Sequence, residues 1–105
     1  MDAQLRKGFI EICVLAAIRN EDLYGYKLIG DMSEYIEISE STLYPILKRL
    51  EASGYLTTYT REYNTRLRKY YKITEEGKKR ITDFLSSKGE VMKIYNFIEG
   101  ENKIE

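Results

Sequence analysis

The sequence predicts a mainly α-helical protein with one two-stranded antiparallel β-hairpin and a long C-terminal helix. Three observations support this fold class. Apolar residues recur at helical spacing through the first half, an alternating run rich in tyrosine and threonine follows, and helical spacing then returns. Because 105 residues are too few for two ordinary domains, we expect one compact domain over 1–74, a helix over 75–99 and a polar tail over 100–105.

The first predicted helix covers about residues 5–18. Its apolar residues follow helical spacing, yet others fill the remaining sides. A helix that is apolar nearly all round needs cover on every side, and two sources stay open: this chain's own helices or a second subunit. Cys13 is the one cysteine of the sequence, and we interpret it as a reduced core residue because unpaired cysteines are usually buried.

A second helix is predicted over about Leu23–Tyr35, where Gly25 near the start permits close packing of helices. Its apolar face consists of Leu28, Ile29, Met32 and Ile36.

The third predicted helix begins at Ser39, a suitable N-cap residue, and ends at Ser53 and Gly54. Pro45 lies inside it and removes one backbone hydrogen bond. The inward stripe at i, i+3, i+4 and i+7 is Leu43, Ile46, Leu47 and Leu50. The residues expected to project from the other side are Ser41, Tyr44, Pro45 and Lys48.

The period changes to two after Gly54, which predicts strands over about 55–60 and 68–73. The intervening residues 62–67 include Asn64, which tolerates a positive φ angle, so the pair is expected to form a hairpin with a polar, basic tip. Thr74 is the expected N-cap of the last helix.

That last helix is predicted as one long helix from about Glu75 to Glu99, with a possible bend at 87–89. Its apolar stripe is Ile81, Phe84, Leu85, Met92, Tyr95 and Ile98. No other predicted element is long enough to cover the distal half of this stripe. A second subunit is therefore the expected cover.

The charges are balanced overall, at 17 basic and 17 acidic residues, but they are unevenly distributed. Residues 39–72 carry seven basic and three acidic side chains, a net charge of plus four against minus three before and minus one after. The positive excess therefore coincides with the third helix and the hairpin. A solvated surface strand is the alternative explanation of the basic residues.

Composition also excludes much chemistry. The chain has no histidine, which excludes Ser-His-Asp and Cys-His relays and imidazole zinc sites, and we expect neither an enzyme nor a cofactor. The longest apolar run is about ten residues, short of the ~20 that a membrane span needs. No signal peptide is recognised, so a cytoplasmic protein without a membrane partner is expected.

Three helices followed by a basic hairpin form the winged helix-turn-helix arrangement, in which the third helix enters the DNA major groove and the hairpin is the wing. Four stretches of this chain resemble the PadR family of bacterial transcriptional regulators, over nearly the whole length from Leu5 to about Ile98. They are LRKGFIEICVLAAI (5–18), YGY (24–26), ISESTLYPILKRLEASG (38–54) and RKYYKITEEG (68–77).

The resemblance implies a homodimeric repressor that binds an inverted-repeat operator in double-stranded DNA. The DNA-binding positions that it implies are Ser39, Ser41, Thr42, Tyr44, Lys48, Arg49, Arg61, Asn64, Arg66, Arg68 and Lys69. The implied dimer contacts are Phe9, Ile10, Cys13, Leu85, Met92, Tyr95 and Ile98. Two departures bear on DNA contact: many relatives have glycine at the position of Ser41, and the wing tip lacks the family's glycines.

The resemblance also leaves an alternative open. The single C-terminal helix resembles the small subgroup of the family, some of whose members bind planar drugs or phenolic molecules in or near the dimer interface. The main activity could therefore be that of a ligand sensor for a small aromatic effector. Met92 and Tyr95 are the candidate ligand contacts. A winged helix that mediates only protein contacts is the remaining non-enzymatic hypothesis.

Overall fold

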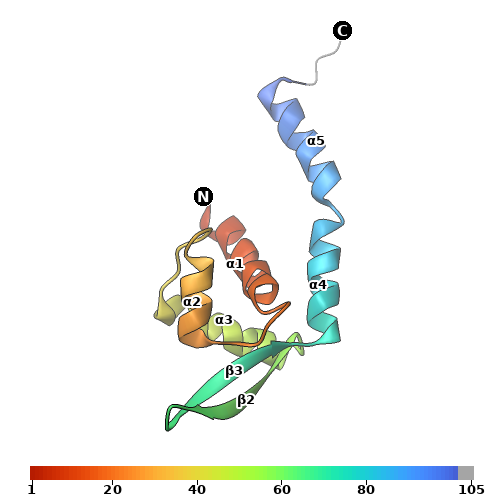
Figure 1. Ribbon diagram of the computed structural model, residues 1–105. Coiled ribbons are helices and arrows are strands. Elements are labelled where there is room, and N and C mark those ends of the chain that lie inside the picture. Colours follow the sequence, from red (N-terminus) through yellow and green to blue (C-terminus); the bar gives the residue numbers. More distant parts are fainter. Residues whose placement is uncertain (102–105) are drawn as a thin grey trace.

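The computed structural model describes residues 1–101 and confirms a mainly helical fold with an antiparallel hairpin. The elements in chain order are α1 (Ala3–Ala17), β1 (Leu23–Tyr24), α2 (Gly25–Met32), α3 (Glu40–Ala52), β2 (Leu56–Tyr63), β3 (Arg66–Ile73), α4 (Glu75–Leu85) and α5 (Lys88–Glu99). Figure 1 shows α1, α2 and α3 gathered into a helical body, with the β2–β3 hairpin projecting below it and α5 above it. The molecule measures 66 × 26 × 21 Å. Most of the predicted polar tail, residues 102–105, lies outside the described residues.

The hydrophobic core lies between the helical body, the base of the hairpin and α4. Leu15, Leu28 and Leu43 come from three different helices and are fully buried. The inward stripe predicted for α3 is confirmed, since all four of its residues are buried. Ile10, predicted at the dimer interface, is 3% exposed in the single chain and packs in this core. This chain's own elements therefore cover much of α1.

The ends of α3 are those that its sequence predicts. The Ser39 Oγ accepts a hydrogen bond from the Thr42 N–H at 3.3 Å, and the chain leaves the helix through Gly54 in the left-handed region. Pro45 lies inside α3, which continues through it.

The sheet has three strands in the order β1-β3-β2, which corrects the predicted two-stranded hairpin. Leu23 and Tyr24 pair with Tyr71 and Tyr70, so α2 begins at Gly25 and not at Leu23 as predicted. The reason is tertiary: Leu23 is buried against the core, and β3 has an open edge whose backbone groups need partners.

The hairpin is longer than the predicted strands. β2 and β3 pair from Leu56 with Ile73 out to Tyr63 with Arg66, and only Asn64 and Thr65 remain in the turn. Both turn residues have positive φ, 51° and 63°, which is the type I′ conformation that matches the twist of paired strands. The positive φ expected at Asn64 is confirmed, whereas the loop predicted over 62–67 is wrong.

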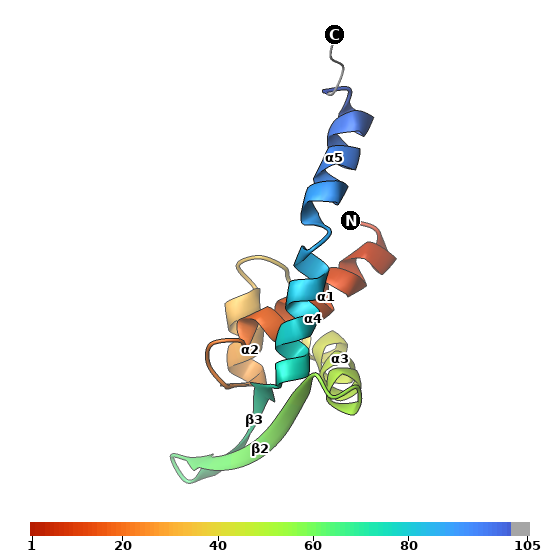
Figure 2. The same ribbon diagram turned by 90° about the vertical axis from the view of Figure 1, so that its right-hand side faces the viewer.

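The C-terminal helical segment, predicted as one long helix, is divided into α4 and α5 by Ser86 and Ser87. The Ser86 Oγ donates to the Asp83 carbonyl oxygen at 2.6 Å and the Ser87 Oγ to that of Phe84 at 3.3 Å. These hydroxyls bond to the last turn of α4. The possible bend was predicted over 87–89, and the interruption includes Ser87, whereas Gly89 lies inside α5. Figure 2 shows α5 continuing upward beyond α4 and away from the helical body.

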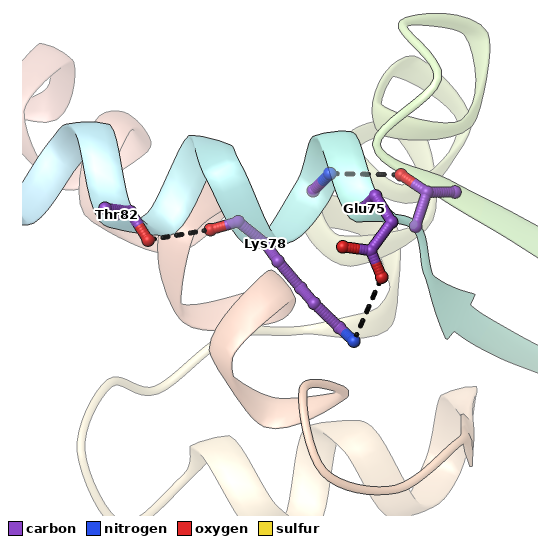
Figure 3. A network of polar contacts seen from close by, with 5 residues as sticks. Glu75, Lys78 and Thr82 are labelled. Carbon is purple, nitrogen blue, oxygen red and sulfur yellow. Dashed lines mark hydrogen bonds and ion pairs between the residues drawn. The ribbon is translucent and has the colours of Figure 1, made fainter.

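The start of α4 is attached to the loop that follows α3. The Thr74 N–H donates to the Tyr55 carbonyl oxygen at 3.1 Å, and the Thr74 Oγ1 donates to that of Gly54 at 2.7 Å. The same hydroxyl accepts from the Gly77 N–H at 3.0 Å, so the predicted cap is confirmed. Figure 3 shows this first turn with the Glu75–Lys78 ion pair, 3.4 Å between Oε2 and Nζ, beside it.

The described residues, 1–101, offer neither a membrane-spanning helix nor a cluster of metal ligands. None of the helices over that range has the length and apolar character needed to cross a bilayer. Nor does any group of three or more Cys, Asp or Glu side chains in that range have an arrangement that could hold a metal ion.

Candidate nucleic-acid interface

Only some of the DNA-binding residues predicted on α3 lie on its solvent-exposed face. At about 100° per residue, Ser41, Tyr44 and Lys48 fall on one side of the helix, opposite the buried stripe. Thr42 and Arg49 fall on the flank that faces α1, where both line a groove between α1 and α3. The structure therefore separates the predicted α3 residues into an exposed face and an α1 flank.

The hydroxyl groups at the start of α3 bond mainly to one another. The Ser39 Oγ donates to the Thr42 Oγ1 at 3.1 Å and lies 3.1 Å from the Ser41 Oγ. Since Ser39 also caps the helix, its hydroxyl is committed to local structure, and Ser41 is the hydroxyl on the exposed face.

Arg49 is tied to the helical body. Its guanidinium donates to the Glu11 Oε2 from Nη2 at 2.5 Å and from Nε at 3.2 Å, which joins α3 to α1. The Glu11 side chain is only 19% exposed. Arg49 therefore orients α3 on α1, a role that the resemblance does not imply.

Tyr44 lies over the start of α2. A Cβ atom added at Gly25 would lie 2.3 Å from the Tyr44 Oη, so only glycine leaves room for this ring position. Tyr44 nevertheless keeps 42% of its surface exposed. Gly25, which the sequence suggested for helix packing, therefore leaves the space that the Tyr44 side chain occupies.

Gly25→Ala is expected to displace the Tyr44 ring while lowering the free energy of unfolding by less than about 1 kcal/mol, because the obstructing atoms are the far end of a flexible side chain. The Tyr44 ring resonances in an NMR spectrum, read beside a urea titration, check this. Gly30→Ala is the matched control, since a Cβ at Gly30 in the same helix meets no atom within 4 Å. Unchanged Tyr44 resonances in Gly25→Ala would show that the ring does not need the glycine.

A groove separates the exposed face of α3 from β3. Lys48 lines it from α3 and Lys69 from β3, with Tyr44 and Tyr71 also along its walls. Both lysines are exposed. Glu51, which also lines the groove, accepts a hydrogen bond from the Thr58 Oγ1 at 3.2 Å. Two cations from two elements thus converge on one groove, next to a carboxylate that already has a partner.

The hairpin presents its predicted basic residues on two opposite faces. Side chains alternate along a strand, and paired residues share a face. Lys69 pairs with Thr60 and lies on the face that continues into the core, whereas Arg68 pairs with Arg61 on the other face. We call that second face of the hairpin, which carries Tyr59, Arg61, Tyr63, Arg66, Arg68 and Tyr70, the outer wing face.

Residues near the tip are the most exposed part of the hairpin. Arg66 pairs with Tyr63, and Asn64 forms the turn; all three are exposed. Leu67, on the Lys69 face, is 77% exposed. Sequence reasoning missed Leu67 because an apolar residue in an alternating strand is ordinarily interpreted as a core residue.

The residues expected at a dimer interface form a largely exposed apolar surface on α5 and at the end of α4. Within the described residues, α5 has no buried side chain. The predicted contacts that remain at least 48% exposed are Leu85, Met92, Tyr95 and Ile98. Sequence reasoning missed Val91, Ile94 and Phe97, which are also exposed. They are exposed because no other described part of this chain covers α5.

The two contacts predicted from α1 are partly covered by this chain. Phe9 packs edge to face on Phe84 of α4, with ring centroids 5.6 Å apart, and keeps 38% of its surface exposed. Cys13 is half-buried, and this burial raises the pKa of its thiol. A raised pKa disfavours the reactive thiolate. Cys13, interpreted from the sequence as a core residue, packs against the core and is only partly buried.

Comparison with known proteins gives concordant matches. The family model described as the transcriptional regulator PadR-like family matches residues 14–83. The crystal structure of smu.1704 from Streptococcus mutans UA159 is 42% identical, with a TM-score of 0.75 over 91% of this chain and 92% of that one. Transcriptional regulator Rv3488 of Mycobacterium tuberculosis is 28% identical over 76% of each chain. Bacillus subtilis PadR, solved in complex with operator DNA, is 27% identical with a TM-score of 0.68 over 73% of this chain and 46% of that one.

Proposed function

Because this chain belongs to the PadR-like family of transcriptional regulators, we propose that it is a sequence-specific DNA-binding repressor that acts as a homodimer on an inverted-repeat operator. The proposal describes a regulator without enzymatic activity that works in the cytoplasm. It extends to this chain the operator binding of its solved relative, the Bacillus subtilis PadR.

The observation that carries the proposal is the groove shared by α3 and β3. Lys48 and Lys69 face it from two elements that lie far apart in the sequence. A winged helix-turn-helix places its recognition helix in the major groove and its wing on the neighbouring backbone. A pair of lysines between these two elements suits a phosphate strand that passes from one to the other.

The proposed contacts follow the placement of each side chain. Ser41, Tyr44 and Lys48 reach base edges or phosphates from α3, while Asn64, Arg66 and Lys69 reach the backbone from the wing. Free backbone N–H groups at the α3 start add phosphate donors. Arg49 with Glu11, and Ser39 with Thr42, support the shape of this surface without contacting the duplex.

The homodimer is proposed from the exposed apolar surface of α5. Val91, Ile94, Phe97 and their neighbours present an apolar face on a helix that stands clear of the helical body (Figure 2). Such a face on a soluble protein requires cover. The α5 helix of a second copy, together with the partner's α1, would supply that cover and place two wings on one duplex.

Lys48→Gln and Arg66→Gln are expected to weaken binding to a duplex recovered by selection from random DNA by about three- to thirtyfold each. In a homodimer each substitution removes two phosphate contacts, one per subunit, and should reduce the slope of log affinity against log salt concentration by about 1.8. Fluorescence anisotropy titrations across a salt series measure both quantities.

Lys93→Gln is the matched control, because it removes one lysine from α5, which lies outside the proposed DNA-binding surface. Circular dichroism should show the same helical content in all three variants. If neither Lys48→Gln nor Arg66→Gln changes affinity or salt slope, the proposed interface is wrong. If selection recovers no duplex at all, the proposed function is wrong.

A small aromatic effector is the second candidate function, proposed from the half-exposed Met92 and Tyr95 on α5. Both side chains would lie between the subunits of the proposed dimer. Release of the selected duplex by a panel of phenolic acids and planar drugs would identify a sensor. If none of these compounds releases the protein from the duplex, it does not act as a sensor for them.

A further inference from the structure

The wing projects from the helical body as a two-stranded ribbon. β1 pairs with β3 only through Leu23 and Tyr24, whereas β2 and β3 continue for several pairs beyond that point. Figure 1 shows β2 and β3 extending beyond the helices. An isolated two-stranded ribbon is marginally stable in water. Other contacts must therefore hold the hairpin in its shape and set its angle to the body.

A continuous stack of rings covers the outer wing face at its base. Tyr59 of β2 stacks on Tyr70 of β3 with ring centroids 5.5 Å apart and planes 10° apart. Tyr24 of β1 meets Tyr70 edge to face at 5.7 Å. The three rings thus join all three strands on one face, in geometries that stabilise aromatic pairs.

Arg68 extends this stack toward the tip. Its guanidinium carbon lies 4.2 Å from the centroid of the Tyr24 ring and 4.3 Å from that of the Tyr63 ring. Arg68 sits on the central strand, Tyr24 on one neighbouring strand and Tyr63 on the other. One cation between two rings therefore links the edge strand of the body to the last residue of β2, across a span that the short β1 ladder does not reach.

Asp22 attaches the stack to the loop between α1 and β1. The Tyr59 Oη donates to the Asp22 Oδ2 at 2.7 Å. This hydrogen bond raises the pKa of Tyr59, since a neutral phenol is the donor that the carboxylate needs. The chain of contacts then runs from Asp22 through Tyr59, Tyr70 and Tyr24 to Arg68.

We propose that Arg68 and the Asp22–Tyr59 pair are positioning residues that hold the wing rigidly on the helical body, so that α3 and the wing tip engage one duplex together. The proposal rests on the proposed DNA-binding function and changes the role that the family resemblance implies for Arg68. Its guanidinium is half-buried between rings, whereas Arg66 is exposed at the tip. Arg66 is therefore the phosphate contact, and Arg68 acts through the orientation of the wing.

The salt dependence of DNA binding separates the two roles. A phosphate contact contributes about 0.9 to the slope of log affinity against log salt concentration, whereas a positioning residue changes affinity with little change in slope. We expect Arg68→Gln and Tyr63→Leu each to weaken binding to the selected duplex by about three- to tenfold with the wild-type slope. Arg66→Gln should reduce the slope.

A double-variant cycle adds a second readout. Because Arg68 and Tyr63 act through one contact, Arg68→Gln combined with Tyr63→Leu should weaken binding no more than the stronger single substitution. Tyr63 is 50% exposed near the tip, so its replacement leaves the core intact. A reduced slope in Arg68→Gln equal to that of Arg66→Gln, with multiplying effects in the double variant, overturns the assignment of Arg68.

Amide hydrogen exchange tests the stiffening without DNA. Tyr59→Phe keeps the ring stack and removes only the hydroxyl that reaches Asp22, and Arg68→Gln removes the cation. Each is expected to speed exchange of the β2 and β3 amides by about three- to tenfold. Tyr35→Phe is the control, since it removes a hydroxyl from a ring that is 83% exposed in the loop after α2.

The DNA-binding titrations and the hydrogen-exchange measurements can fail separately. Unchanged hairpin exchange in both Tyr59→Phe and Arg68→Gln overturns the proposal whether or not the protein binds DNA. If wild-type protein binds no selected duplex while the hairpin exchange responds as expected, the proposed function fails, the positioning of the wing for DNA fails with it, and the stiffening of the hairpin remains.

Discussion

Gly77→Ala is expected to lower the free energy of unfolding by about 2–3 kcal/mol, because the added methyl group would overlap packed atoms. A Cβ atom at position 77 would lie 2.2 Å from the Tyr55 carbonyl oxygen and 2.7 Å from the Ile73 Cγ1. The Tyr55 carbonyl oxygen belongs to the backbone, and the hydrogen bond that it accepts from the Thr74 N–H holds it in place. Relief would require moving the start of α4 away from the loop after α3.

Urea unfolding followed by circular dichroism measures the effect of Gly77→Ala, with all variants at one protomer concentration because subunit association would contribute to stability. Gly89→Ala is the matched control: it adds the same methyl group inside α5, where a Cβ meets no atom within 4 Å. It should stabilise the protein by up to about 1 kcal/mol, since alanine favours helix over glycine. Equal midpoints for the two variants would contradict the close packing at Gly77.

Ile94→Asp is expected to convert the proposed dimer to monomers at micromolar concentration and to weaken binding to the selected duplex more than about a hundredfold. Ile94 is 53% exposed on the apolar surface of α5. In a dimer, the substitution would bury an unpaired carboxylate in each subunit, which costs several kcal/mol per charge. Loss of the dimer then halves the number of α3 helices and wings that act on one operator.

Sedimentation velocity and anisotropy on the same samples measure association and DNA binding together. Lys93→Asp is the control, because it places the same carboxylate on the polar side of α5, next to Ile94 in sequence, and should leave the protein dimeric. Wild-type protein that sediments as a monomer at micromolar concentration would refute the dimer. An Ile94→Asp variant that stays dimeric would show that α5 is not part of the dimer interface.

The predictions that held depend on short-range physics. Ser39 and Thr74 cap their helices because a hydroxyl reaches an N–H group three residues ahead, wherever the helix lies in the fold. The α3 stripe is buried because its spacing matches the helical repeat. The candidate DNA face on α3 follows from the same periodicity, so Ser41, Tyr44 and Lys48 could be located in advance.

The features that the sequence did not reveal depend on partners distant in sequence. β1 exists because β3 offers an open edge, and a two-residue strand has too little sequence to give a periodic signal. Arg49 is drawn toward α1 by Glu11, which lies 38 positions earlier. Neither contact leaves a pattern within its own element.

Local sequence is enough to place α3, its buried stripe, the caps at Ser39 and Thr74, the basic hairpin and the family, because each is encoded in runs of adjacent residues. The packed chain was needed to show which face of the wing each cation occupies, that Arg68 lies between two rings from different strands, and why position 77 must be glycine. Those features depend on strand register and on close approach between separate elements, and both arise only when the chain has packed.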